Sequence, residues 1–352
     1  MKKLYFLILL FFITSFNVSA QLVDVVTGVD TPYEIAFNRN DLYVIEGGAG
    51  KIIKIDVTTS TPVAEDFLTG LNGITAIALN GNDLYYASIP GIFKVDITDN
   101  SQTLVEIVSP DDLDSSVGAM EIYNNQLYFS AIVNNNNGIH RTDLTGGASI
   151  EQLISVGFSS NGLAFIGSTL YASIEFEGKV IYLDVADTNP VATDFMTGLN
   201  GPRGIRFIDD YLYVAEAFGG QLSRIDSTLS TPEIEVIATD LDFLYGLASN
   251  STDLYIAEHS NDKISKLDTN TLTVEEFESQ YNVALFPNPS VNEISISGLN
   301  HETSYSILNM QGSIVSTGTI KPTNSKISTQ GLSQGIYFLN LDNNTTLKFI
   351  KK

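Results

Sequence analysis

Short runs of apolar residues alternate with polar turns along most of the chain. The runs are rich in Ile, Val, Tyr and Phe, and Gly, Asn or Asp interrupts them every 6–10 residues. Such runs predict β-strands, because an amphipathic helix needs a longer stretch with apolar residues three or four positions apart. We therefore expect an all-β chain from residue 21 to residue 280.

A Leu-Tyr pair that follows a polar turn marks an internal repeat. Its copies lie at Leu42-Tyr43, Leu84-Tyr85, Leu127-Tyr128, Leu170-Tyr171, Leu212-Tyr213 and Leu254-Tyr255. The spacings between copies are 42, 43, 43, 42 and 42 residues. In each unit an apolar run precedes the pair, and a run that ends in Asp and a fourth run follow it. Four short strands per unit of this length predict one blade of a β-propeller.

Six copies of the repeat predict a six-bladed β-propeller over residues 21–280. Residues 22–38 align with the fourth strand of one blade and the first strand of the next, so the N-terminal segment can close the ring. Closure removes exposed sheet edges, which favour aggregation. Residues 272–279 also have the pattern of a fourth strand. The sequence therefore leaves the outermost strand of the sixth blade undecided.

The Tyr of each pair and the Asp that ends each third run recur in all six units, which indicates structural roles. Strand tyrosines at one position of every blade are expected to pack between neighbouring sheets. The aspartates are expected to accept hydrogen bonds from the backbone of the turns that follow them. They are Asp56, Asp96, Asp143, Asp184, Asp226 and Asp268.

Residues 1–20 have the parts of a secretory signal peptide. Lys2 and Lys3 precede an apolar run, and Val18-Ser19-Ala20 supplies the small residues of a cleavage site. The run is shorter than the roughly 20 residues that a membrane-spanning helix needs. The chain contains no Cys, which excludes disulfides, thiolate metal ligands and a lipoprotein signal. We expect a secreted protein with no transmembrane anchor.

Acidic residues are concentrated in the first 281 positions. Residues 21–281 hold 38 of the 41 Asp and Glu but 11 of the 18 Lys and Arg, a net charge of −27, whereas residues 282–352 carry +2. This change predicts a domain boundary near residue 280. The acidity disfavours nucleic acid as a partner. It is consistent with bound cations or with a soluble acidic surface.

The repeat ends at Asn282, and a different all-β pattern follows. Alternating strands with turns at Gly298–Asn300, Gln311-Gly312 and Gln334-Gly335 predict a small β-sandwich over residues 281–352.

Four motifs occur in order in this last segment. They are Phe286-Pro287-Asn288-Pro289, Tyr305–Gly312, the run Leu332–Leu339 that includes Gly335 and Tyr337, and the terminal Lys348–Lys352 with Lys351 and Lys352. With these motifs the segment resembles the type A C-terminal sorting domain of the type IX secretion system. The resemblance implies passage through the periplasm, recognition by the outer-membrane translocon, and secretion or display on the cell surface. The alternative is an ordinary adhesive sandwich.

The six repeats resemble NHL-type and gluconolactonase-like (senescence-marker-like) propellers. This resemblance implies a divalent metal in the channel, held by residues from blades one, three, four and five. Asp30 and Asn161 match two of these positions, whereas Val117 and Arg203 occupy the other two. A guanidinium repels a cation, which disfavours lactonase activity by the family mechanism.

Glu46, Glu216 and Glu258 are candidate metal ligands. Each lies four residues after the Leu of its repeat, in blades that are adjacent once the ring closes. Carboxylates that converge there could bind a divalent cation such as Ca²⁺. The alternative is that they are solvated strand ends.

Arg203, Asn161, Glu34 and His259 are the candidates for ligand binding. Arg203 could bind a carboxylate or sulfate at the channel mouth. It could instead pair with Glu216 or Glu34 and hold the loops together, which we favour. His259 follows Glu258 and could serve as the base of a lyase.

We therefore expect a secreted propeller that binds an unknown extracellular ligand. A metal-dependent lactonase-like or lyase-like enzyme, with an altered site around Asp30, Asn161, Arg203 and His259, is the alternative.

Overall fold

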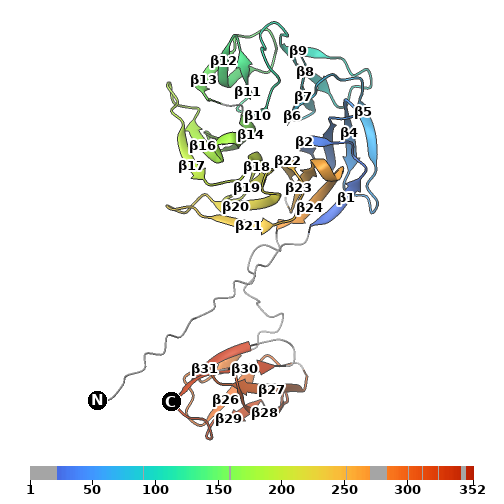
Figure 1. Cartoon of the computed structure of the whole chain (residues 1–352). Helices are drawn as coiled ribbons and strands as arrows, with labels where there is room; N and C mark the ends of the chain where they lie inside the picture. The colour runs from blue at the N-terminus through green and yellow to red at the C-terminus, as the bar shows by residue number, and fades with distance from the viewer. Residues whose placement is uncertain are drawn as a thin grey trace, which may run out of the picture. The chain divides into compact units, whose positions relative to one another are not determined.

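The chain folds as two compact all-β units, seen in a computed structural model (Figure 1). The structure describes residues 22–89, 91–157, 160–250, 252–269, 284–299, 301–310, 312–323, 325–341 and 346–352. The predicted signal peptide, the segment 272–279 and the predicted boundary near residue 280 lie outside the described residues. Each unit is described by itself below.

The first unit contains six separate four-stranded antiparallel sheets over its described residues. The first strands are β2 (Pro32–Asn38), β6 (Ala76–Asn80), β10 (Ala119–Tyr123), β14 (Ser160–Ile166), β18 (Pro202–Ile208) and β22 (Leu244–Ser249). The second strands carry the Leu-Tyr pairs and are β3 (Asp41–Glu46), β7 (Asp83–Ser88), β11 (Gln126–Val133), β15 (Thr169–Ile174), β19 (Tyr211–Glu216) and β23 (Asp253–Glu258).

The third and fourth strands complete each sheet. The third strands are β4 (Lys51–Asp56), β8 (Gly91–Asp96), β12 (Asn136–Asp143), β16 (Lys179–Asp184), β20 (Gln221–Asp226) and β24 (Lys263–Asp268). The fourth strands are β5 (Ala64–Leu68), β9 (Val105–Val108), β13 (Glu151–Ser155), β17 (Thr193–Thr197), β21 (Ile234–Ala238) and, for the last sheet, β1 (Val23–Thr27).

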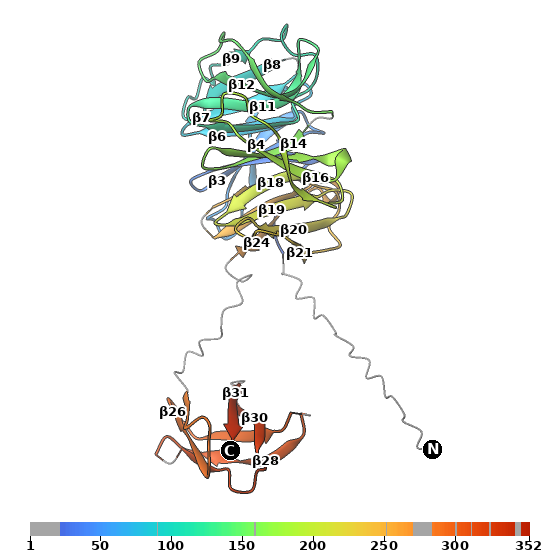
Figure 2. The same ribbon diagram turned by 90° about the vertical axis from the view of Figure 1, so that its left-hand side faces the viewer.

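The first strands of neighbouring sheets contact each other in a closed cycle, and they surround the centre of the unit in Figure 1. In the side view of Figure 2, the strands run across the thickness of this ring and the loops lie on its two faces. Strand β1 pairs antiparallel with β24, with Val23 opposite Lys266. The N-terminal strand therefore closes the last sheet of the ring.

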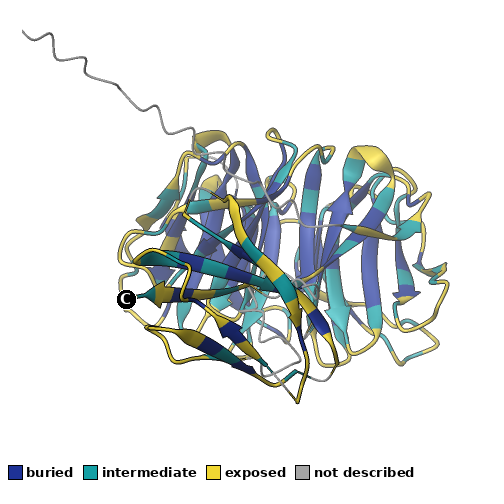
Figure 3. Cartoon of the chain, turned by 90° about the horizontal axis from the view of Figure 1, so that it is seen from below, coloured by how far each residue is buried: buried dark blue, intermediate teal, exposed yellow. Residues whose placement is uncertain are grey.

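The recurring tyrosines are buried, with at most 9% of each residue exposed. Each packs with side chains of the next sheet: Tyr43 joins a cluster with Ile77, and Tyr255 joins one with Ile35. Figure 3 shows the buried inner strands and the exposed loops. The expectation that these tyrosines pack between sheets is confirmed.

The recurring aspartates hold the turns after the third strands. Asp56 Oδ1, for example, accepts hydrogen bonds from the backbone N and the Oγ1 of Thr58, at 2.9 and 2.7 Å. These bonds lower the pKa of Asp56. The same pair of bonds forms between Asp96 and Thr98. The predicted role in the turns is confirmed at these positions.

The second unit has two sheets. One has the order β25-β26-β29 and the other β28-β27-β30-β31. Side chains from both sheets, among them Ile294, Ile307 and Phe349, form one core. The strands are β25 (Ala284–Phe286), β26 (Glu293–Ser297), β27 (Thr303–Leu308), β28 (Ile314–Ile320), β29 (Lys326–Ser328), β30 (Gly335–Leu341) and β31 (Thr346–Lys351).

Candidate functional site

Small residues line the central channel of the first unit. Because Ala and Gly fill little space where the six first strands meet, they leave a cavity of about 120 Å³. The small lining residues are Ala36, Ala78, Ala119, Gly162, Gly204 and Ala248. A Cβ atom on Gly204 would collide with the carbonyl oxygen of Tyr245, so glycine is also needed for the close approach of β18 and β22.

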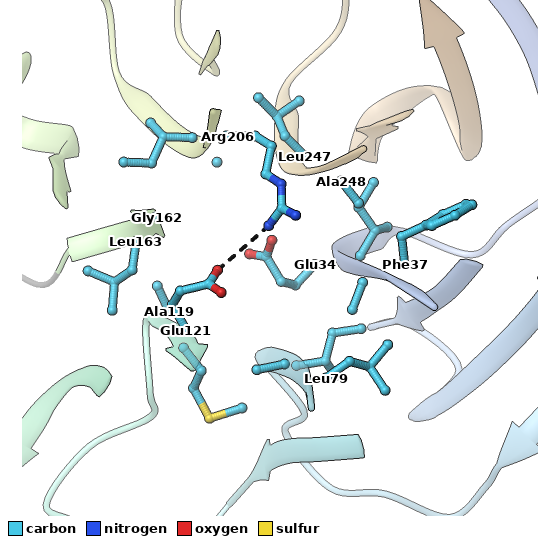
Figure 4. Close-up of a pocket in the computed structure, with 17 residues that line it drawn as sticks. Glu34, Phe37, Leu79, Ala119, Glu121, Gly162, Leu163, Arg206, Leu247 and Ala248 are labelled. Carbon is cyan, nitrogen blue, oxygen red and sulfur yellow. Dashed lines mark ion pairs between the residues drawn. The ribbon is translucent and has the colours of Figure 1, made fainter. Parts of the chain in front are cut away.

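Three ionisable side chains project into this channel and point toward one another: Glu34 from β2, Glu121 from β10 and Arg206 from β18 (Figure 4). Arg206 Nη1 lies 3.8 Å from Glu121 Oε2, and its Nε donates a hydrogen bond of 3.2 Å to Ser249 Oγ. Although the channel leaves Glu34 partly exposed, burial by the surrounding strands raises its pKa to about 8. The pKa of Glu121 is also raised by burial. Burial therefore favours the protonated form of Glu34.

Arg203 forms a buried ion pair with Glu175 at one mouth of the channel. Its Nε and Nη2 lie 2.9 and 2.7 Å from Glu175 Oε1, and Asn161 Nδ2 donates to Oε2 of the same carboxylate. The side chains of Arg203 and Glu175 are 14% and 2% exposed. The expectation that Arg203 pairs is therefore right in kind, but the partner is Glu175 rather than Glu216 or Glu34.

An arc of aromatic side chains lies beside Arg203 at the same mouth. Its guanidinium carbon lies 4.0 Å from the ring centroid of Tyr245 and 5.1 Å from that of Phe243. We define the aromatic arc as Phe176, Phe218, Phe243, Tyr245, His259 and Tyr33. Successive members are in contact, with ring centroids 6.1 Å apart for Phe176 and Phe218, and 4.6 Å apart for Tyr245 and Tyr33.

His259 lies within this arc, 5.0 Å from the ring centroids of both Tyr33 and Tyr245. Burial lowers its pKa, and the positive charge of Arg203 lowers it further. The imidazole is therefore neutral at neutral pH. The structure thus brings Arg203, Asn161 and His259 to one mouth, whereas Glu34 lies in the channel.

The structure does not bring Glu46, Glu216 and Glu258 together. Each carboxylate is buried, and it accepts hydrogen bonds from residues that lie in its own sheet or in the loops beside that sheet. Glu46 Oε1 accepts from the backbone N of Asp30 at 2.9 Å, and Glu216 Oε2 accepts in the same way from Asn200 at 2.6 Å. Glu258 accepts from Asn261 Nδ2 and from the Oγ of Ser265. These bonds hold the loops at the strand ends.

The residues present do not fit a divalent cation at this mouth. The side chain of Asp30 is exposed, and its backbone N donates a hydrogen bond to Glu46 Oε1. The charge of Glu175 is already neutralised by Arg203, and Asn161 presents its amide nitrogen, rather than its oxygen, to that carboxylate. Among the described residues, no three His, Cys, Asp or Glu side chains gather closely enough to hold a metal ion.

Sequence reasoning missed Glu175 and most of the aromatic arc. Counted from the Leu of its repeat, Glu175 falls one residue later than Glu46, Glu216 and Glu258 do from theirs. It is the first residue of the short 3₁₀ turn η1 (Glu175–Glu177), which follows β15. The residues that follow each second strand were the available signal for the arc. Large side chains stand one or two residues beyond four of these strands, at Ile89, Phe176, Phe218 and His259.

In the second unit, the predicted sorting residues meet at one end of the sheets. Asn288 Nδ2 donates to the carbonyl oxygen of Lys348 at 3.1 Å, and Asn288 Oδ1 accepts from the backbone N of Ile350 at 2.9 Å. Pro287 and Pro289 flank Asn288 and follow cis peptide bonds. The next residue, Ser290, bonds to Ile350 and Lys352 through its backbone.

The two remaining sorting residues lie in the neighbouring strand. Gly335 pairs with Lys351, and Tyr337 pairs with Phe349, in the ladder between β30 and β31. The Tyr337 hydroxyl donates to the carbonyl oxygen of Ser333 at 3.0 Å. Two motifs that are about 60 residues apart in sequence therefore form one structural feature, which we call the Asn288 clasp: residues 286–290 and 348–352.

The first unit has the fold of known propellers. It is similar to the calcium-binding protein regucalcin of Agrobacterium tumefaciens, with 12% identity, a TM-score of 0.55, and coverage of 71% of this chain and 93% of that one. It is also similar to a streptogramin B lyase, with 15% identity, a TM-score of 0.53, and coverage of 70% and 96%. No curated protein sequence matches the chain. At these identities the likeness concerns the fold alone.

A third similar structure spans both units. It is PorZ, a surface component of the type IX secretion system of Porphyromonas gingivalis, with 15% identity and a TM-score of 0.50. The match covers 91% of this chain but 51% of PorZ.

No helix in the described part of the chain is long and apolar enough to cross a membrane.

The C-terminal unit matches a family model. Residues 284–352 match the secretion system C-terminal sorting domain, and this match contains the whole Asn288 clasp. The resemblance that the sequence motifs suggested is confirmed. The chain thus consists of a propeller-like unit followed by a C-terminal sorting domain of the type IX secretion system, which directs it to the cell surface or the extracellular space.

Proposed function

We propose that this protein is a secreted, six-bladed β-propeller that binds an extracellular ligand at one mouth of its channel. We also propose that the sorting domain is a small β-sandwich, read by the type IX translocon as an address. The closed cycle of first strands supports the first statement, and the core shared by two sheets supports the second.

The exposed part of the aromatic arc is the observation that carries the binding function. Phe176 is 67% exposed and Phe218 is 49% exposed, and they continue into the partly buried rings at the channel mouth. Exposed aromatic side chains cost free energy in water, and contiguous patches of them mark interaction sites. Aromatic residues also supply a large share of the free energy at binding interfaces.

The Arg203 ion pair gives this mouth a fixed shape. It ties the start of β18 to η1, the turn after β15, and Ser173 Oγ donates a hydrogen bond of 2.6 Å to the carbonyl oxygen of Arg203. A ring cluster supported by such bonds loses little conformational entropy when a ligand binds. We therefore assign a supporting role to Arg203 and the contact surface to the rings.

Binding to the cell envelope tests this function. The purified mature chain is titrated against envelope fractions of the organism that makes it, in parallel with Phe218→Ala. We expect saturable binding that the variant weakens. Tyr182→Ala is the matched control, because Tyr182 is an exposed aromatic residue (37%) on β16 outside the arc. Equal binding by wild type and Phe218→Ala would contradict the proposed binding face.

A further inference from the structure

We propose that the aromatic arc is a platform for a neutral oligosaccharide or polysaccharide. This inference rests on the proposed binding function and names the class of ligand. It depends on three features of the channel mouth: the extent of the arc, the polar groups beside it, and the sign of their charge.

The arc is long compared with one sugar ring. Its rings come from the loops and strands of four adjacent sheets, from Phe176 after β15 to Tyr33 in β2. Neighbouring centroids along it are 4.6–6.1 Å apart. Gly201 makes room for this arrangement, because a Cβ atom there would lie 2.5 Å from Cδ2 of Phe218. An extended ligand with several flat apolar faces can therefore contact several rings at once.

Exposed polar side chains border the rings. Asp242 and Asp262 lie near enough to His259 to affect its pKa, and Asp262 Oδ1 accepts a hydrogen bond of 3.0 Å from the backbone N of Thr31. Asp30 and Asn200 are exposed in the loops that precede β2 and β18. These groups provide hydrogen-bond acceptors next to apolar ring faces.

This combination selects an amphipathic ligand. A purely apolar partner would remove these carboxylates from water without pairing them, which is unfavourable. A sugar ring presents C–H groups on its face, which can lie against an aromatic ring, and hydroxyls at its edge, which can donate to carboxylates.

Charge restricts the ligand further. Arg203 is neutralised by Glu175, so the groups named at this mouth carry a net negative charge. The rest of residues 21–281 is also strongly acidic. Sulfated and carboxylated polysaccharides would be repelled, especially at low salt. Neutral glycans meet no such barrier.

Affinity electrophoresis of the full mature chain tests the inference. Native gels contain laminarin, xyloglucan or mannan as neutral probes and dextran sulfate as the anionic probe. We expect at least one neutral polysaccharide to retard the wild type and dextran sulfate to leave it unaffected. The double variant Phe176→Ala/Phe218→Ala should bind about tenfold more weakly or worse, which corresponds to about 1.4 kcal/mol. Tyr182→Ala should bind as the wild type does.

Two further measurements make the result decisive. Phe176→Tyr/Phe218→Tyr keeps flat rings and should retain binding, and circular dichroism should show that every variant is folded. Retardation by dextran sulfate alone, retardation by none of the probes, or equal retardation of the alanine variant would overturn the inference. If envelope binding is lost after protease but survives periodate, which cleaves sugar diols, the binding function stands and the glycan assignment falls.

Discussion

Replacement of Glu34 by Gln should change how the stability of the propeller unit depends on pH. Burial raises the pKa of Glu34 from its ordinary 4.5 to about 8, so the folded protein keeps a proton that the unfolded chain loses at lower pH. For an acid with a raised pKa, the free energy of unfolding falls as pH rises from about 4.5 to about 8. A glutamine in the same place does not ionise and removes this loss.

The size of the effect follows from the two pKa values. At about 1.4 kcal/mol per pKa unit, a rise from 4.5 to about 8 corresponds to roughly 5 kcal/mol. Solvent in the channel weakens the effect, because Glu34 is partly exposed there. We therefore expect Glu34→Gln to gain roughly 2–4 kcal/mol over the wild type between pH 5 and pH 9. Glu121, Arg203 and Arg206 lie near Glu34 in both proteins, so their titration differs between the two only through its coupling to the Glu34 charge.

Urea unfolding at several pH values between 5 and 9 measures this difference. Circular dichroism is the suitable signal, because the chain contains no Trp. Glu65→Gln controls for the loss of one acidic group, since Glu65 is exposed on β5. If the gain from Glu34→Gln is the same at pH 5 and pH 9, the carboxyl is not held protonated by burial and the reasoning is refuted.

Three other substitutions or deletions test separate parts of the structure. Arg203→Ala leaves the carboxylate of Glu175 buried with the Asn161 hydrogen bond but without a counter-charge, so urea unfolding should show a loss of roughly 3–5 kcal/mol. Arg203→Ala/Glu175→Gln should recover part of this loss, and an equal loss in both variants would refute the ion-pair argument. Deletion of Val23–Thr27 removes β1 and exposes the edge of β24, so sedimentation should detect aggregates. A monodisperse product would show that β1 is dispensable for closing the ring. Asn288→Ala removes both side-chain hydrogen bonds of the Asn288 clasp. Thermal unfolding of the sorting domain should then show a free energy of unfolding lower by about 1–2 kcal/mol. An unchanged unfolding midpoint would mean that these bonds contribute nothing to stability.

The repeat made the sheets of the first unit predictable from the sequence. Each Leu-Tyr pair fixed the second strand of a sheet, because its side chains must be buried in the same way in every unit. The outermost strand of the last sheet was left undecided, because residues 22–38 and 272–279 have similar patterns. Pairing between β1 and β24 joins segments that are about 240 residues apart, and hydrophobic periodicity carries no information about such a contact.

The candidate site was predictable only in part. The place of Arg203 next to the first strand of its unit followed from the repeat, although the structure puts it within β18 rather than in a loop. Its partner Glu175 did not follow, because a one-residue difference after β15 hides Glu175 from alignment. The aromatic arc was missed for a related reason. Its members come from two separate segments of the repeat: Phe176 and Phe218 follow the second strand, whereas Tyr33 and Tyr245 lie in the first strand. Only the packing of neighbouring sheets around the ring brings these segments together. In the sorting domain, by contrast, short motifs such as Pro287–Pro289 identify the module without any need for its geometry.

Export is the most direct test of the central claim that the C-terminal domain addresses this protein for secretion. Cells that make the full chain and cells that make a chain without residues 284–352 are separated into periplasm, outer membrane and medium, and the propeller unit is detected by antibody. We expect the propeller of the full chain at the cell surface or in the medium and the truncated chain in the periplasm. Efficient appearance of the truncated chain outside the cell would contradict the account.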